Sequence, residues 1–183
     1  MAATSVSPSK SRLRALAAPV AVPRMGAFVG LATLSAVQAW EWLFSGLSKV
    51  QNPVFVRQFV GFIAGSHVPY RDEMLALVNL APGLFPRVVE GVELVLGVTL
   101  FVATVVVLLP VGRVRRWAIL AAGSASLIGA VTAVNIAFLA GNRPPWTIST
   151  APFGTGVPVE ALLAGMSIAG VAEAYSAWRM LSV

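Results

Sequence analysis

Four long apolar segments decide what this chain can fold into. They span about residues 25–47, 85–109, 117–141 and 157–181. Each is long enough to cross the roughly 30 Å hydrocarbon core of a bilayer as an α-helix, which rises about 1.5 Å per residue. The sequence therefore predicts an all-α membrane protein, a bundle of four transmembrane helices.

The composition supports this prediction and restricts the partners. Mean hydropathy is +0.83 and 11% of residues are charged, whereas about a quarter are charged in a soluble domain. The net charge of +6 would suggest nucleic acid in a soluble protein. Here the basic residues lie mostly before or between apolar segments, where they set orientation and contact anionic lipid. We therefore expect membrane lipid, and not nucleic acid, as a partner.

The distribution of charge predicts the topology. Residues 1–24 are basic and rich in Ser, Ala and Pro, which is typical of a disordered cytosolic tail, and residues 25–183 form the membrane domain. The connection between the second and third segments carries Arg113, Arg115 and Arg116 without an acidic residue. Basic loops stay in the cytoplasm, so both termini are expected there.

The connection between the first two segments, residues 48–84, is long and only moderately polar. Its stretches VFVRQFVGFIAG and RDEMLALVNLA each have the pattern of a short amphipathic helix. We expect two interfacial helices that lie on the outer membrane surface or fold over the bundle. His67, between them, is interpreted as a surface residue.

The absence of cysteine removes several chemistries at once. A chain without Cys cannot form disulfides, thiolate nucleophiles or cysteine-ligated iron–sulfur clusters. Its single histidine, His67, cannot alone provide a bis-histidine haem site or a multi-histidine metal site. No metal site is predicted, and any redox centre with protein ligands would belong to a partner protein.

Polar residues inside the apolar segments predict the location of a site. Buried charges cost several kcal/mol in a membrane unless they are paired, protonated or hydrated. With the topology above, several such residues share one level near the outer face. The candidate ligand or proton site comprises Glu41, Lys49, Glu90, Glu93 and Asn135, supported by Gln38, Arg87 and Arg143.

Two spacings sharpen this prediction. Glu90 and Glu93 are three residues apart and share a helix face. Gln38, Glu41, Ser45 and Ser48 form a polar stripe along the first helix. The two faces could enclose a hydrated cavity or the head group of a polar ligand.

A purely structural role for the acidic residues stays open. The glutamates of the first two segments could simply pair with Arg87 or Lys49. Glu160 would interact with the helix dipole at its N-terminus. Glu173, near the inner face, is expected to pair with an arginine of residues 113–116.

Several short motifs resemble the DoxX/DoxD family of small four-helix membrane proteins. The first helix ends in FSGLSKVQNP, and the second carries Glu-Leu-x-Leu-Gly from Glu93 to Gly97. The end of the third helix with its loop reads NIAFLAGNRPPW, and PFGTG precedes the fourth helix. The resemblance covers about residues 25–180 and implies the plasma membrane of a bacterium. It also implies a quinone-facing or complex-anchoring role beside a redox partner, with Lys49 and Glu93 as the matching residues. The long first loop and Glu41 depart from the family pattern, so the resemblance specifies no substrate.

Three functions follow as hypotheses. The first is a membrane subunit of a quinone-linked redox complex, which binds quinone or lipid near the outer face and does not catalyse alone. The second is a structural or assembly subunit that docks a membrane or extracytoplasmic partner, or a further copy of itself. The third is a small-solute transporter, which ranks last because no broken midplane helix is evident.

Overall fold

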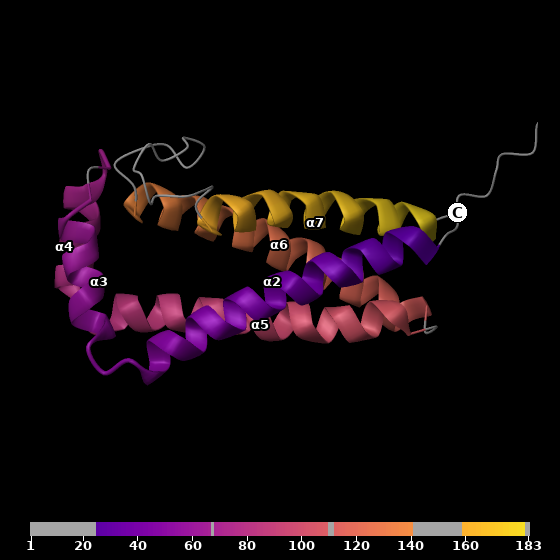
Figure 1. Cartoon of the computed structure of the whole chain (residues 1–183), viewed down its shortest axis with the longest axis horizontal. Helices are drawn as coiled ribbons and strands as arrows, with labels where there is room; N and C mark the ends of the chain where they lie inside the picture. The colour runs from indigo at the N-terminus through magenta and orange to yellow at the C-terminus, as the bar shows by residue number, and fades with distance from the viewer. Residues whose placement is uncertain (1–24, 67, 110–111, 141–158, 182–183) are drawn as a thin grey trace, which may run out of the picture.

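The computed structural model describes residues 25–66, 68–109, 112–140 and 159–181, which fold into helices with no strand among them. The helices are α2 (Met25–Gln51), α3 (Phe55–Ala64), α4 (Arg71–Leu80), α5 (Leu84–Leu108), α6 (Gly112–Ala140) and α7 (Val159–Leu181). The four long helices lie side by side, and the two short ones lie across one end of them (Figure 1). The prediction of an all-helical chain is confirmed.

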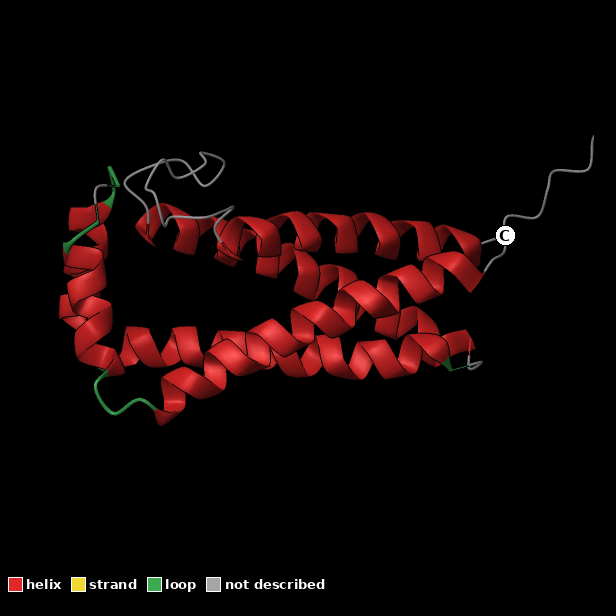
Figure 2. Ribbon diagram, in the orientation of Figure 1, coloured by secondary structure: helices red, strands yellow, loops and turns green. Residues whose placement is uncertain are grey.

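The long helices form a closed ring of neighbours. α2 packs against α5 and α7, and α6 packs against the same two helices. Successive long helices run in opposite directions, so α2 ends, and α5 begins, at the end that α3 and α4 cover (Figure 2). The predicted pair of short amphipathic helices is therefore present, folded over this end of the bundle.

The helix ends differ from the predicted ones where polar residues continue a helix. α2 runs to Gln51 and not to residue 47, because the first strong stop is Asn52-Pro53, and a residue before proline disfavours helix. α6 begins at Gly112 and not at residue 117. The arginines assigned to a loop are thus helical, as their high intrinsic helix propensity allows.

Three of the described helices are long and apolar enough to cross a membrane: α2, α5 and α6. α7 is also long, but Ala, Gly and Ser alternate with its larger residues, and it carries Glu160 and Glu173. The architecture is consistent with a helical membrane protein.

The packing has small residues inside and large apolar residues outside. Buried positions include many alanines, among them Ala39, Ala122 and Ala133, while Val95, Phe101 and Leu127 are more than half exposed. Small residues at helix interfaces are typical of membrane bundles, whose large side chains face lipid. This distribution suits a bilayer far better than water.

Glycines set the closest approach, between α2 and α5. A Cβ on Gly97 would lie 2.8 Å from the backbone nitrogen of Leu43, and one on Gly46 would lie 3.2 Å from that of Leu94. No side chain fits in so short a gap. The two helices are therefore in backbone contact just below the short helices.

A central polar cluster of four buried residues joins α2, α6 and α7. The hydroxyl of Ser167 donates a hydrogen bond of 2.9 Å to Oε1 of Gln38, whose amide donates to the carbonyl of Leu34. The cluster consists of Gln38, Trp42, Ser126 and Ser167. It gives the mid-bundle contact a directional component that apolar packing lacks.

Candidate functional site

The candidate site is built around an ion pair between α2 and α5. Lys49, in the last turn of α2, donates from Nζ to the carboxylate of Glu93, three turns into α5. The Glu93 side chain is fully buried, while that of Lys49 is 22% exposed. These are the two residues that carry the family resemblance, and the fold brings them together from 44 positions apart.

The ammonium group of Lys49 has a second, fixed partner. Nζ donates to the hydroxyl of Ser45, one turn earlier on α2, at 2.7 Å. The Phe55 ring lies with its centre 6.0 Å from Nζ, the outer limit for a cation–π contact. A carboxylate, a hydroxyl and an aromatic ring therefore surround a cation that keeps partial access to its surroundings.

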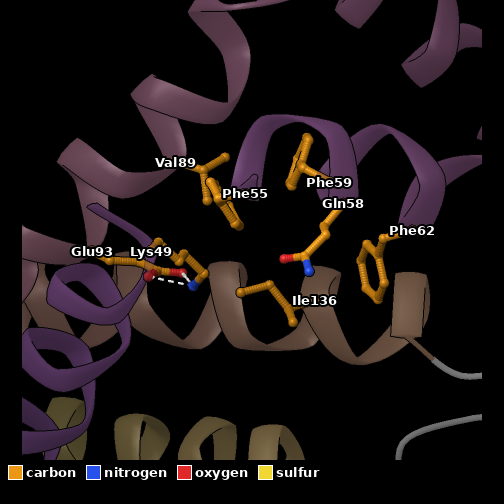
Figure 3. A pocket seen from close by; sticks show the side chains of 8 residues that line it. All are labelled: Lys49, Phe55, Gln58, Phe59, Phe62, Val89, Glu93 and Ile136. Atoms are coloured by element: carbon orange, nitrogen blue, oxygen red, sulfur yellow. Dashed lines mark hydrogen bonds and ion pairs between the residues drawn. The ribbon is translucent and has the colours of Figure 1, made fainter. Parts of the chain in front are cut away.

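The ion pair closes one end of an apolar cavity of about 270 Å³. α3 forms one wall with aromatic side chains, α5 contributes Val89, and α6 contributes Ile136 (Figure 3). The lining residues are Lys49, Phe55, Gln58, Phe59, Phe62, Val89, Glu93 and Ile136. The cavity is thus an apolar chamber with charge at one end.

Local sequence explains why α3 lies over this cavity. After α2 ends, the side chain of Asn52 accepts a hydrogen bond from the Val54 amide at 3.1 Å, which turns the chain into α3. The Phe59 ring then packs between Phe55 and Phe85, with ring centres 5.7 and 5.9 Å away. Phe85 belongs to α5, so aromatic contacts fix α3 to the bundle.

Gln58 adds a second polar group to the lining. Its Oε1 accepts a hydrogen bond of 2.8 Å from the Asn52 amide, so its own amide nitrogen is left to donate. The side chain extends from α3 into the chamber between Phe59 and Phe62, and its amide lies apart from the Lys49 ammonium group (Figure 3). Hydrogen-bond donors therefore stand at two separate places along an apolar wall.

Glu90 and Arg87 form a separate ion pair. Arg87 Nη1 lies 2.7 Å from Glu90 Oε2 along the same helix, and the Glu90 side chain is 4% exposed against 55% for Arg87. Neither residue lines the chamber. This pair fits the structural alternative for Glu90, whose carboxylate is neutralised one turn away.

Two predicted members of the site lie elsewhere. Asn135 is exposed and donates at 2.8 Å to the carbonyl of Val131 in its own helix, while the next residue, Ile136, lines the chamber. Glu41 is half-buried, does not line the chamber, and has no hydrogen bond or ion pair among the described residues. The position of these two residues along their helices places them near the α3–α4 end of the bundle. The rotation of each helix about its axis, however, directs their side chains away from the chamber.

The predicted polar stripe on α2 is present only in part. Gln38 and Ser45 do face inward, but Gln38 belongs to the central polar cluster and not to the chamber. Ser48 is exposed and bonds to the backbone of its own helix. Lys49 takes the inward position in its place.

Arg143, His67 and Glu173 are three further residues for which the sequence made a prediction. Arg143 and His67 lie outside the described residues. Glu173 is not in any of the ion pairs of the described chain: its carboxylate lies against α2, where a Cβ on Gly30 would be 3.3 Å from Oε2. Arg115 stacks on Phe28 instead, 4.8 Å from the ring centre.

The aromatic wall of the chamber was not predicted from the sequence. Phe55, Phe59 and Phe62 recur at the four- and three-residue spacing of one helix face, and this signal could have found them. Within the described ranges, no three His, Asp or Glu residues lie close enough to hold a metal ion. What the chamber offers is an apolar space with a buried ion pair and an amide.

Comparisons with protein-family models, curated proteins and solved structures found no match to this chain.

Proposed function

We propose that this chain is a four-crossing protein of the bacterial plasma membrane, with both termini in the cytoplasm. α7 completes the bundle beside α2 and α6, although it is less apolar than the other spans. The arginines at the start of α6 lie at the end opposite α3 and α4, which agrees with the positive-inside rule. α3 and α4 then lie along the outer interface.

Within this topology, the chamber under α3 binds the head group of a quinone. The observation that carries this proposal is the Lys49–Glu93 ion pair at the end of a phenylalanine-walled chamber. Apolar pockets with a few well-placed polar groups are typical small-molecule sites. A ligand that fits this chamber needs a flat apolar body to pack against the phenylalanine rings. It also needs hydrogen-bond acceptors for Lys49 and Gln58.

A quinone ring meets both requirements. Its two carbonyl oxygens accept hydrogen bonds on opposite sides of a flat ring, and the chamber has Lys49 at one end and Gln58 further along (Figure 3). Phe59 and its aromatic neighbours offer ring faces for stacking. A quinone also reaches the site through the lipid, since it is membrane-soluble.

The Lys49–Glu93 ion pair would take part in the proton transfer that accompanies quinone reduction. Reduction of a quinone to a quinol takes two electrons and two protons. Lys49 Nζ would supply one of these protons, with Glu93 holding its ammonium group in place, and the second proton would come from water. The electrons come from a partner protein that carries the redox centre, in line with the DoxX-like resemblance.

Bound quinone provides the test. The full chain is extracted with native lipids into nanodiscs, and its lipids are analysed for quinone by mass spectrometry. We then titrate the quinone-free protein with decylubiquinone. Phe62→Ala removes a chamber ring that is outside the Phe55–Phe59–Phe85 contacts that fix α3. The lost stacking is worth about 1 kcal/mol, so the Kd should rise roughly fivefold.

The control is Phe101→Ala, an exposed phenylalanine on α5 outside the chamber, which should leave the Kd unchanged. Absence of quinone from the native extract, together with no saturable decylubiquinone binding, removes the proposal. A stable protein partner that copurifies without any quinone would instead favour the structural or assembly role.

A further inference from the structure

A second concave site lies at the other end of the molecule, between α6 and α7. It is a groove of about 310 Å³ whose lining includes Leu120, Gly123, Leu127, Val171, Tyr175 and Trp178. It occupies the halves of α6 and α7 that are distant from α3 and α4 (Figure 1). The chamber under α3 and this groove share no residue.

Small residues at the contact between the two helices create the groove. A Cβ on Gly123 would lie 3.1 Å from the Cβ of Ala174, so the helices meet there without large side chains. Leu120 and Leu127 rise beside this floor from α6, and Tyr175 rises from α7, all three substantially exposed. The result is an open apolar trough of the kind that an acyl chain can fill.

Cations stand at the end of the trough. Arg116 lies one turn before Leu120 on the same face of α6, and its guanidinium donates at 2.6 Å to the carbonyl of Leu181 at the end of α7. Arg179 donates at 3.2 Å to the hydroxyl of Tyr175, which lines the trough. Both guanidinium groups are anchored through one nitrogen and keep further N–H donors for another ligand.

Acidic side chains do not neutralise these cations. None of the three ion pairs in the described part of the chain involves Arg113, Arg116 or Arg179. The one nearby acid on α7, Glu173, has its carboxylate against Gly30 of α2 and thus not in the trough. Within residues 112–140 and 159–181, the end of the trough therefore carries positive charge that no acidic side chain pairs with, beside an apolar surface.

We propose that this trough binds an anionic phospholipid. The acyl chain lies against Gly123 and its apolar walls, and the phosphate accepts hydrogen bonds from Arg116 and Arg179. Arginine suits this role because its planar fork matches phosphate oxygens. Tyr175 and Trp178 mark the interfacial depth at which a phospholipid changes from chain to head group.

Charge selects this occupant over a second copy of the chain. A second copy docking through the same face would bring two sets of unpaired arginines together, which is unfavourable. A zwitterionic lipid would fill the trough but would place a second cation beside the guanidinium groups. An anionic phospholipid matches both parts of the site, because its acyl chain fills the apolar trough and its head group neutralises the arginines.

Lipid selectivity tests the proposal independently of quinone binding. The purified, delipidated full chain is mixed with phosphatidylglycerol or phosphatidylcholine with identical acyl chains, and retained lipid is counted by native mass spectrometry. We expect phosphatidylglycerol to be retained about tenfold more strongly. The double variant Arg116→Gln/Arg179→Gln should lose this preference.

Two further variants keep the result decisive. Arg57→Gln removes an exposed arginine from α3, at the opposite end, and should keep the preference. Ser124→Phe, which places a ring in the trough, should reduce retention of both lipids. Equal retention of the two lipids by the unmodified chain, or equal loss in Arg57→Gln, would overturn the proposal.

Discussion

Removing the two partners of the Lys49–Glu93 ion pair one at a time should have unequal effects on stability. Lys49→Met keeps the length and apolar stem of the side chain but leaves a fully buried carboxylate without its cation. Breaking a buried pair in this way costs about 3–5 kcal/mol of unfolding free energy. Glu93→Gln leaves a lysine that is 22% exposed and can turn toward water, so about 1–2 kcal/mol is expected.

The double variant should recover much of the loss. Lys49→Met/Glu93→Gln buries no unpaired charge, so its unfolding free energy should exceed that of Lys49→Met alone by about 1–2 kcal/mol. The assay is denaturant unfolding in mild detergent, followed by tryptophan fluorescence. Trp42, one turn from Ser45 and buried, is a suitable reporter.

Arg71→Gln provides the matched control, because Arg71 and Asp72 form an exposed pair. Exposed pairs contribute at most about 1 kcal/mol, so this change should be nearly silent. Equal losses of unfolding free energy in Glu93→Gln and Lys49→Met, or a loss in the double variant equal to the sum of the single losses, would contradict this prediction. Either result would mean that the buried carboxylate is not charged or does not depend on Lys49.

Two more predictions concern the helix contacts. Gly97→Ala should destabilise the bundle by about 1–3 kcal/mol, since its Cβ would meet the backbone of Leu43 at 2.8 Å. Gly91→Ala in the same helix meets nothing within 4 Å and should stabilise it by about 0.5–1 kcal/mol; matching effects of the two changes in unfolding titrations would contradict the packing. Gln38→Leu should cost about 0.5–2 kcal/mol by leaving the Ser167 hydroxyl without its acceptor. A double-mutant cycle with Ser167→Ala checks this, and a coupling energy of zero would show that the hydrogen bond contributes nothing.

The sequence predicted the elements of this fold well because length and apolar composition are local properties. The long helices and both short ones are where the pattern placed them, and the errors at their ends come from polar residues that extend a helix. Lys49 is the clearest case: the predicted segment stopped at about residue 47, but the helix continues until Asn52-Pro53. An apolar segment marks the part of a helix that a membrane can accommodate, whereas helix propensity and stop signals determine where the helix ends.

The sequence predicted the position of the site along the bundle axis, but not which side chains point into it. Topology alone put Lys49, Glu93 and Asn135 near one end of the bundle, and the first two do meet. Asn135 fails because neighbouring residues on a helix point about 100° apart, so Ile136 takes the inward place. Which face turns inward depends on contacts between helices, such as those of Gly97, that no single segment encodes.

Under the proposed four-crossing topology, the central polar cluster bears on how α7 inserts into the membrane. α7 is not among the three described helices that are long and apolar enough to cross a membrane. Its residues Ser167 and Glu173 both lie on surfaces that meet α2. In lipid alone, these groups would have no partner outside their own helix. We expect α7 to insert stably only after α2 and α6 are in place, so that the first helix made acts as the template for the last. A variant that lacks residues 1–51, and therefore α2, should then leave α7 outside the bilayer, although no residue of α7 has changed.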